Sequence, residues 1–379
     1  MAVELEIHTS INDIHPAEWE RCFGRDYPFL RYDFLAGLER SACTTEAAGW
    51  QPCHLLLRDQ EICIAAAPGF LKSHSYGEYV FDWAWADAWQ RNGLDYYPKL
   101  ITAAPFTPSS GPRLFIDADY PQAQKVFLSA VANFCEQQNI SGWHLLFTPE
   151  DLADSLDPSL WCRRTTTQFH WFNKDYRCFD DFLARFNSRK RKNLRRERQR
   201  IVEQGLSLTT RVGSDIGAEH WQFFHRCYQM TYAKRSGHGG YLTREFFTEV
   251  CPALGDATVM VIAEQADRPV AAALYFQSAD TLYGRYWGCL EEFENLHFEA
   301  CYYQGIEYCI ANNKQRFDPG AQGEHKIQRG FEPVLTHSAH WVAEPDFRAA
   351  IASFCDRERE QVDRYRKDAS TYLPFKNED

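Results

Sequence analysis

The sequence predicts a mixed α+β fold, in which mostly antiparallel mixed sheets are flanked by helices in two domains. Three observations predict it. The chain has 379 residues, which is more than one hydrophobic core usually organises. Residues 257–288 contain three apolar runs separated by the turn sequences ADRP and SAD, a pattern typical of an antiparallel meander. A loop, a helix and a short strand follow this meander, so sheet and helix share one core.

Composition excludes several classes of protein. Hydrophobic residues make up 45% and charged residues 25%, which excludes a long disordered, collagen-like or low-complexity chain. No stretch approaches the ~18 apolar residues of a membrane helix, and the start MAVELEIHTSI does not resemble an export signal. The 13 cysteines include no CxxC pair, as expected for reduced thiols in a core, so we expect a cytoplasmic protein without a metal site.

The first third of the chain mixes short strands with helices. Residues 54–72 hold two apolar runs around a polar turn, which predicts a hairpin. The loop 105–113, rich in proline and glycine, is expected to face solvent or a cleft. Apolar residues at helical spacing predict a helix over 121–139, and WHLLF at 143–147 predicts a buried strand. Polar residues around Pro158 predict a domain junction, and we expect the first domain to span 1–160.

The second domain is expected over 161–345, with a C-terminal helix and tail over 346–379. It begins with a strand at 168–172 and a helix over 182–203, and a strand near 206–211 precedes the meander. No internal sequence repeat is visible, although two domains of one fold can diverge beyond such detection.

One segment departs from the acidic average of the chain. The formal net charge is -11, yet residues 189–200 read RKRKNLRRERQR and carry a net charge of +7. Helical spacing places Arg189, Lys192, Arg196 and Arg200 near one stripe. This stripe could bind phosphates or a nucleic-acid backbone, and the alternative is a solvated helix face. The acidic remainder argues against a general nucleic-acid coat protein.

Several phrases resemble a known family. They include GEYVFDWAWADAW, PFTPSSGPRL, FNSRKRKNLRRERQRI, HFEACYYQGIEYCI and FDPGAQGEHKIQRGFEP, and together with shorter phrases they extend from about residue 77 to residue 334. The chain resembles the GNAT acyltransferase superfamily, and within it the FemAB-like group of peptidoglycan biosynthesis or recognition proteins. The resemblance implies two GNAT-like units that meet at a cleft, and transfer of an acyl group to an amine.

The resemblance leaves the acyl donor open. Some relatives take an aminoacyl group from aminoacyl-tRNA and add it to a peptidoglycan-precursor peptide, whereas ordinary superfamily members use acetyl-CoA. In the latter, a glycine-containing loop before a helix holds the cofactor's pyrophosphate. The corresponding segment here, CLEEFENLH, has no glycine between Glu291 and His297. An aminoacyl-tRNA or an acyl-CoA therefore remains the expected donor, with no metal, and tRNA is a candidate partner.

The sequence GAQGEHKIQRG supplies groups suited to acyl transfer. Glu324, His325 and Lys326 place an acid, an imidazole and a cation in one short stretch. In the family pattern a lysine lies shortly before a Gly-Phe pair, which Lys326 resembles. We expect Lys326 to stabilise negative charge on the reacting carbonyl or on a donor phosphate. The alternative is a surface loop with ordinary charges.

Further candidates lie before this stretch. His297 and Glu299 lie at the start of the helix after the meander, where either could orient an amine or accept its proton. Equally, Glu299 could only stabilise the start of the helix and His297 could be an ordinary loop residue. Arg285 lies in a strand suited to burial, so its charge needs a partner, either a substrate carboxylate or Asp318.

The first domain offers substrate-binding candidates that could reach phosphate or peptide, namely Tyr97, Lys99, Ser109, Ser110 and Arg113. Its tryptophans Trp83, Trp85 and Trp89 could stack on a base or sugar, although aromatic stripes more often fill cores.

Three functions fit these observations. The first is an acyltransferase that forms an amide from an aminoacyl-tRNA or acyl-CoA donor and an amine, which belongs to a small molecule or to a peptidoglycan-related peptide. The second is a conventional acetyl-CoA-dependent N-acetyltransferase that acts on a small amine. The third is a non-catalytic module that binds RNA or a cell-wall precursor. The sequence predicts no oligomeric state.

Overall fold

A computed structural model describes residues 3–237, 239–321 and 323–376. The chain forms two compact units, each made of two separate stretches of sequence. Unit 1 comprises Met1–Thr167 and Leu335–Arg364, and unit 2 comprises Gln168–Val334 and Tyr365–Asp379. The domain limits expected at residues 160 and 345 stay predictions.

Unit 1 contains two sheets and short helices. Its strands are β1 (Val3–His8), β2 (Trp50–Pro52), β3 (His54–Asp59), β4 (Ile62–Ala67), β5 (Phe70–Lys72), β6 (Lys99–Thr102), β7 (Phe115–Ile116) and β8 (Gly142–Thr148). Its helices are η1 (Ile11–Asp13), α1 (Pro16–Phe23), η2 (Pro28–Leu30), α2 (Tyr32–Arg40), α3 (Trp83–Arg91), α4 (Ala123–Gln137) and α5 (Glu150–Ser155). Three further elements contain a unit boundary: β9 (Trp161–Phe172), β15 (Glu332–Val342) and α12 (Pro345–Ser370).

The predicted hairpin is present as β3 and β4, which pair antiparallel in the four-stranded sheet β1-β3-β4-β7. The other strands of unit 1 follow the order β15-β8-β6-β5-β2, in which β6 and β8 are parallel and the other pairs antiparallel. The predicted helix over 121–139 is α4, which buries Phe127, Val131 and Cys135 at a spacing of four residues. These side chains join the apolar core of unit 1.

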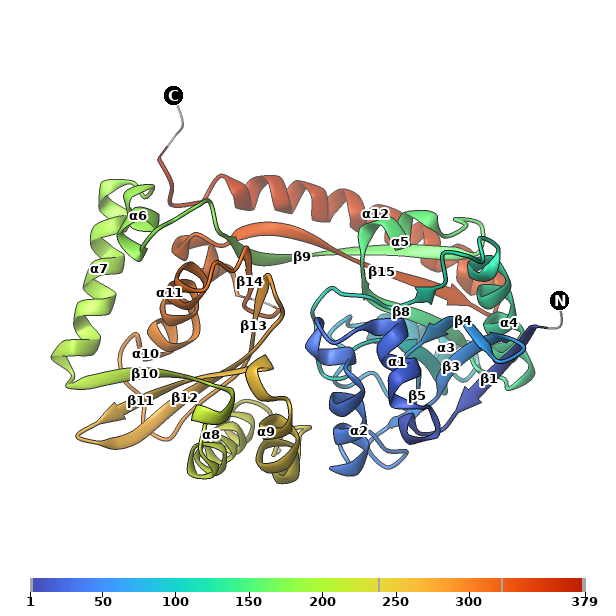
Figure 1. Cartoon of the computed structure of the whole chain (residues 1–379). Helices are drawn as coiled ribbons and strands as arrows, with labels where there is room; N and C mark the ends of the chain where they lie inside the picture. The colour runs from blue at the N-terminus through green and yellow to red at the C-terminus, as the bar shows by residue number, and fades with distance from the viewer. Residues whose placement is uncertain (1–2, 238, 322, 377–379) are drawn as a thin grey trace. The chain divides into compact units, whose positions relative to one another are not determined.

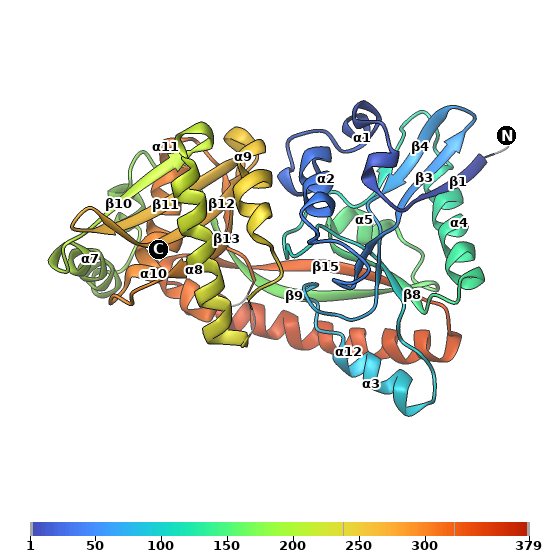
Figure 2. The same cartoon turned by 90° about the horizontal axis from the view of Figure 1, so that it is seen from below.

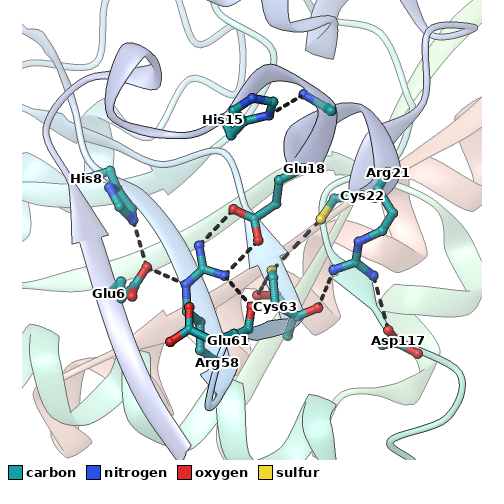
Figure 3. Close-up of polar contacts among 12 residues, drawn as sticks. Glu6, His8, His15, Glu18, Arg21, Cys22, Arg58, Glu61, Cys63 and Asp117 are labelled. Carbon is teal, nitrogen blue, oxygen red and sulfur yellow. Dashed lines mark hydrogen bonds and ion pairs between the residues drawn. The ribbon is translucent and has the colours of Figure 1, made fainter.

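Arg58 joins three elements of unit 1 (Figure 3). Its Nε donates to Glu6 of β1 at 2.8 Å, and its two terminal nitrogens donate to Glu18 of α1 at 2.7 Å. The bidentate bond to Glu18 raises the pKa of Arg58 above its usual range. In the same view, Arg21 of α1 donates to the main-chain oxygen of Cys63 at 2.6 Å. These contacts fix α1 on the four-stranded sheet.

The structure contradicts one expectation for unit 1, namely that the loop 105–113 faces solvent or a cleft. Residues 105–109 and Arg113 are buried. The guanidinium of Arg113 donates to the main-chain oxygens of Ser109 at 2.7 Å and of Leu146 at 2.6 Å. Because these bonds satisfy main-chain acceptors inside the unit, the loop can be buried without losing hydrogen bonds.

Unit 2 is built around one sheet. Its strands are β10 (Leu206–Val212), β11 (Thr258–Gln265), β12 (Arg268–Gln277), β13 (Thr281–Cys289) and β14 (Arg316–Asp318), with the end of β9. Its helices are α6 (Phe179–Ala184), α7 (Ser188–Glu203), η3 (Gly213–Asp215), α8 (Ala218–Ser236), η4 (Phe246–Val250), α9 (Cys251–Ala253), η5 (Gly255–Ala257), α10 (Leu296–Phe298), η6 (Glu299–Tyr303), α11 (Gln304–Ala311) and η7 (Glu324–Arg329).

The predicted meander is confirmed. The strand order is β10-β11-β12-β13-β14-β9, and β10 to β13 pair antiparallel, whereas β13 and β14 are parallel. Helices cover both faces of this sheet: α8 and α9 lie on one side, and α7, α10 and α11 lie on the other (Figure 1). Figure 2 shows α8 crossing the strands. The mixed α+β class with helices on the sheets is therefore confirmed.

The basic helix differs from the predicted span 182–203. Phe182 belongs to the separate helix α6, and α7 begins only at Ser188. The side chain of Asn187 accepts from the main-chain N–H of Lys190 at 3.0 Å, so it caps α7 and separates the two helices. Leu194 is one of the buried residues of α7, whose other faces are largely polar.

The longest helix, α12, has 26 residues and carries charged side chains along its length. Within the described ranges, no helix combines the length and the apolar character that a membrane span needs.

Candidate active site

The predicted GEHK stretch folds as the helical turn η7, bracketed by two glycines with positive φ. Gly323 has φ 104° and Gly330 has φ 83°, values that favour glycine. A Cβ atom at Gly330 would lie 2.8 Å from the ring of Phe182. The two glycines therefore allow η7 to turn closely against the core of unit 2.

Lys326 points its ammonium group into a ring of main-chain oxygens. The side chain is 2% exposed, and Nζ donates to Gly320 O at 2.7 Å and to the oxygens of Pro319 and Ala321 at 3.4 Å each. Burial lowers the pKa of Lys326 to about 8, although the negative charge of Asp318 opposes this shift. The structure thus holds a cation with a depressed pKa at the end of β14.

His325 and His297 lie beside each other with their rings 6.1 Å apart. The hydroxyl of Tyr302 is 2.9 Å from Nε2 of His325, and the ring of Tyr302 is 5.4 Å from that of His297. Desolvation and the charges of Lys326 and Arg329 lower the pKa of His325 to about 4. Desolvation lowers the pKa of His297 to about 3. Both imidazoles are neutral at neutral pH and can accept a proton.

Arg329 completes the cluster and ties it to the basic helix. Its guanidinium lies 3.4 Å from the ring centroid of Phe298 and donates to the carboxylate of Glu197 at 2.9 and 3.1 Å. The hydroxyl of Tyr303 donates to the same carboxylate. Cation–π and ion-pair contacts therefore hold η7, η6 and α7 together.

The two predicted carboxylates have different surroundings. Glu299 is 4% exposed and accepts from Nη2 of Arg198 at 2.9 Å and from Nε2 of Gln304 at 2.8 Å. Glu324 is exposed and accepts from the hydroxyl of Tyr365 at 2.7 Å. Glu299 is thus held in an ion pair with α7, whereas Glu324 contacts the last helix.

Arg285 borders the same loop as Lys326. A Cβ atom built at Gly320 would lie 3.8 Å from Nη1 of Arg285, and the charge of Arg285 contributes to the lowered pKa of Lys326. The carboxylate of Asp318, the alternative partner expected for Arg285, lies 3.5 Å from Nε2 of His170. The structure therefore brings Lys326, His325, His297 and Arg285 into one region of unit 2.

The predicted substrate-binding residues of unit 1 form internal contacts. Lys99 is fully buried, and Nζ donates to Ser75 Oγ at 2.8 Å, to Glu78 at 2.7 Å and to Asp82. Burial disfavours the charged form of Lys99, but the carboxylates of Glu78 and Asp82 hold its pKa above the usual value. Tyr97 shares a hydrogen bond of 2.8 Å with Ser75. Like Arg113, these residues contact their own unit, and their substrate role stays a prediction.

Three of the four residues expected in the stripe on α7 are Arg189, Lys192 and Arg196. Their side chains are exposed, and none of these side chains hydrogen-bonds or pairs with another residue in the described part of the chain. By contrast, Arg195 pairs with Asp180 at 2.9 Å, and Arg200 pairs with Glu203 and Glu294. The stripe is therefore available to bind anions.

Sequence reasoning missed Tyr302 and Arg329. For Tyr302 the reason is the π-helical segment η6, in which the main chain bonds to the fifth residue rather than the fourth. This extra residue per turn brings Tyr302, five positions after His297, to the imidazole. The aromatic pair in HFEACYY was a signal, but helical spacing of 3.6 residues does not select it.

All thirteen cysteines are free thiols. Among the described residues, no group of three or more His, Cys, Asp or Glu side chains could hold a metal ion.

Comparisons with known proteins agree with this description. The sequence profile of the FemAB-like family, described as peptidoglycan biosynthesis/recognition, matches residues 10–377. No curated protein matches the chain. The crystal structure of FemX superimposes with a TM-score of 0.54 at 10% identity and covers 92% of this chain and 100% of that one. A protein of unknown function from Bacteroides thetaiotaomicron gives 0.52 at 12% identity, over 89% and 100%.

The two superpositions show a shared fold, and the profile spans nearly the whole chain. The resemblance expected from the sequence is therefore confirmed. The chain belongs to the FemAB-like family.

Proposed function

We propose that the chain transfers an aminoacyl or acyl group from an aminoacyl-tRNA or acyl-CoA donor to an amine of a peptidoglycan-related peptide. The observation that carries this proposal is the placement of buried Lys326 beside two neutral imidazoles. Acyl transfer to an amine needs a positive charge near the carbonyl oxygen and a base for the amine proton. The family description, which refers to peptidoglycan biosynthesis/recognition, supports the acceptor class.

In the proposed reaction the neutral amine attacks the carbonyl carbon of the donor. The new C–N bond forms and the carbonyl oxygen becomes negative, and Lys326 stabilises that charge. Two of its three contacts to main-chain oxygens are 3.4 Å long, so they are weak and can give way to a substrate oxygen. The carbonyl then re-forms as the bond to the donor oxygen or sulfur breaks, and the leaving hydroxyl or thiol takes up the proton that the amine has lost.

The amine proton passes to a neutral imidazole. His325 has Tyr302 as a fixed partner, so we assign it the role of base, and His297 orients the amine beside it. We assign the binding of a substrate carboxylate to Arg285, because its guanidinium borders the loop of Lys326. Glu299 and Glu324 act as positioning residues, because one is paired with Arg198 and the other bound by Tyr365.

We assign the binding of the acyl donor to α7. The exposed stripe of Arg189, Lys192 and Arg196 suits a donor that carries several phosphates. The segment between Glu291 and His297 lacks the glycine that would let main chain approach a pyrophosphate. Both features favour aminoacyl-tRNA over acetyl-CoA as the donor.

The test is a transfer assay with a panel of donors. Purified chain is incubated with charged tRNA or with acetyl-CoA and with a muramyl peptide acceptor, and new amide bonds are detected by mass spectrometry. Product from charged tRNA supports the proposal. Product from acetyl-CoA alone would identify acyl-CoA as the donor, and absence of product on the muramyl peptide from every donor would contradict the proposal.

A second candidate is a binding module without chemistry. It is favoured by one observation: three main-chain oxygens already surround the ammonium of Lys326. Under this alternative the residue only fixes its loop. Tight binding of precursor or RNA without product from any donor would support it.

A further inference from the structure

A short segment of unit 1 displays aromatic rings to solvent. Tyr76 is 54% exposed, Phe81 53% and Trp83 40%, whereas Glu78 and Asp82 between them are buried. Trp85 and Trp89, which lie on another face of α3, are also buried. Large exposed aromatic side chains in one cluster usually mark a binding surface. We call Tyr76, Phe81 and Trp83 the aromatic patch.

The patch rests on buried anchors. The carboxylates of Glu78 and Asp82 both accept from Nζ of Lys99, which is itself fully buried. The main-chain oxygen of Tyr76 accepts from Nε1 of Trp50 at 3.1 Å. These hydrogen bonds fix residues 76–83, while the rings of the aromatic patch remain exposed to solvent.

The backbone of this segment is strained. Tyr79 has φ 63° and Phe81 has φ 57°, in the left-handed region that bulky side chains rarely adopt. Such conformations persist only where the surroundings fix them, and they concentrate at functional sites. The anchors around Lys99 provide that fixation. The exposure of Phe81 and Trp83 is thus a built feature of the fold.

The geometry of the rings indicates the ligand. The centroids of Tyr76 and Trp83 are 5.0 Å apart and the rings are tilted by 58°, so the two rings pack against each other and form one continuous apolar surface. One and two helical turns after Trp83, α3 exposes Asp87 and Gln90 on the same side. Apolar ring faces beside a carboxylate and an amide suit a sugar, which has C–H faces and hydroxyl edges.

We propose that the aromatic patch binds an amino-sugar ring of the peptidoglycan glycan. The ring faces would pack on Tyr76 and Trp83, and the sugar hydroxyls would bond to Asp87 and Gln90. The identity of the glycan rests on the proposed function. Asp87 and the net charge of -11 disfavour a polyanion or an acidic lipid at this surface. A neutral, hydroxylated ring has no such penalty.

The test is calorimetric titration of the full chain with chitotetraose, a soluble β-1,4-linked tetramer of N-acetylglucosamine, and with maltotetraose for comparison. We expect chitotetraose to bind, and Trp83→Ala to weaken it by at least about tenfold. Tyr76→Ala should act in the same direction. Tyr372→Ala removes a ring that is 64% exposed in unit 2 and serves as the matched control, with unchanged affinity. Circular dichroism confirms that each variant is folded.

Equal affinity of Trp83→Ala and the original chain would overturn the proposal, as would absence of chitotetraose binding at millimolar concentration. Loss of cosedimentation with phosphatidylcholine vesicles in Trp83→Ala, without sugar binding, would also overturn it and assign the patch to lipid. Transfer to a sugar-free peptide acceptor separates this inference from the proposed function. If the chain binds sugar in a Trp83-dependent way but transfers no acyl group, the aromatic patch is still a sugar-binding site. Only the proposed acyltransferase function is then contradicted.

Discussion

The hydroxyl of Tyr302 and Nε2 of His325 share a hydrogen bond of 2.9 Å across two helical segments of unit 2. When Nε2 carries the hydrogen and donates it to the phenol, Nδ1 is the free acceptor on the imidazole. A Cβ atom at position 323 would lie only 3.1 Å from Nδ1. Because Gly323 has no side chain, space remains beside this nitrogen. The contact therefore gives His325 a fixed orientation for receiving a proton.

Tyr302→Phe tests this orientation. Removal of the hydroxyl keeps the ring in the core but frees the imidazole to rotate, so we expect kcat to fall about tenfold or more with little change in KM. Steady-state kinetics with the best donor of the panel measures it, and Tyr372→Phe on the surface is the matched control. An unchanged kcat would remove Tyr302 from the mechanism.

The pH dependence of transfer tests the charges assigned to Lys326 and His325. Burial lowers the pKa of Lys326 to about 8, and the charged form is the active one, so the rate falls as pH rises through about 8. Desolvation lowers the pKa of His325 to about 4, so the neutral base is present above that pH. We expect a plateau between these values. A rate that stays constant up to pH 10 contradicts the role of Lys326.

A buried histidine pair in unit 1 predicts loss of stability in acid. His144 and His340 are 2% and 1% exposed, with their Nδ1 atoms 2.6 Å apart. Burial lowers the pKa of His144 to about 3 and that of His340 well below 6.5. The unfolded chain binds more protons than the native chain as pH falls from about 6.5, so the free energy of unfolding decreases there.

The expected slope is up to ~1.4 kcal/mol per pH unit for each histidine. Urea unfolding at a series of pH values between 7.5 and 4.5 measures it, and calorimetry checks the proton uptake on unfolding. A midpoint that does not move over this range contradicts the neutral buried pair.

The stripe on α7 predicts salt-dependent donor binding. Changing Arg189, Lys192 and Arg196 together to alanine should weaken a phosphate-bearing donor and flatten the dependence of affinity on salt. The matched control changes Arg195 and Arg200, which lie on the same helix but already have carboxylate partners. If the control weakens binding as much as the triple variant, a general charge effect rather than the stripe is responsible.

Local pattern predicted much of unit 2. The meander over 257–288 was visible because apolar runs and turn sequences alternate within one stretch, and the glycines around Lys326 marked a tight turn. The break before α7 was missed because the capping role of Asn187 depends on a single side-chain bond.

The surroundings of charged residues could not be predicted in the same way. Lys99 and Arg113 look exposed in sequence, but Glu78, Asp82 and main-chain oxygens distant along the chain provide their partners. Such burial depends on tertiary contacts that periodicity does not encode. Tyr302 escaped detection for a similar reason, because the π-helical turn changes which residues share a face.

The most direct test of the account is single-turnover transfer by Lys326→Ala with a charged tRNA donor and a muramyl peptide acceptor. Lys174→Ala, a surface lysine paired with Glu332, is the matched control. We predict that loss of the Lys326 ammonium lowers the transfer rate by about 10²-fold or more, while donor and acceptor still bind and the control keeps full activity. Full turnover in folded Lys326→Ala would contradict the central claim that this residue stabilises the reacting carbonyl.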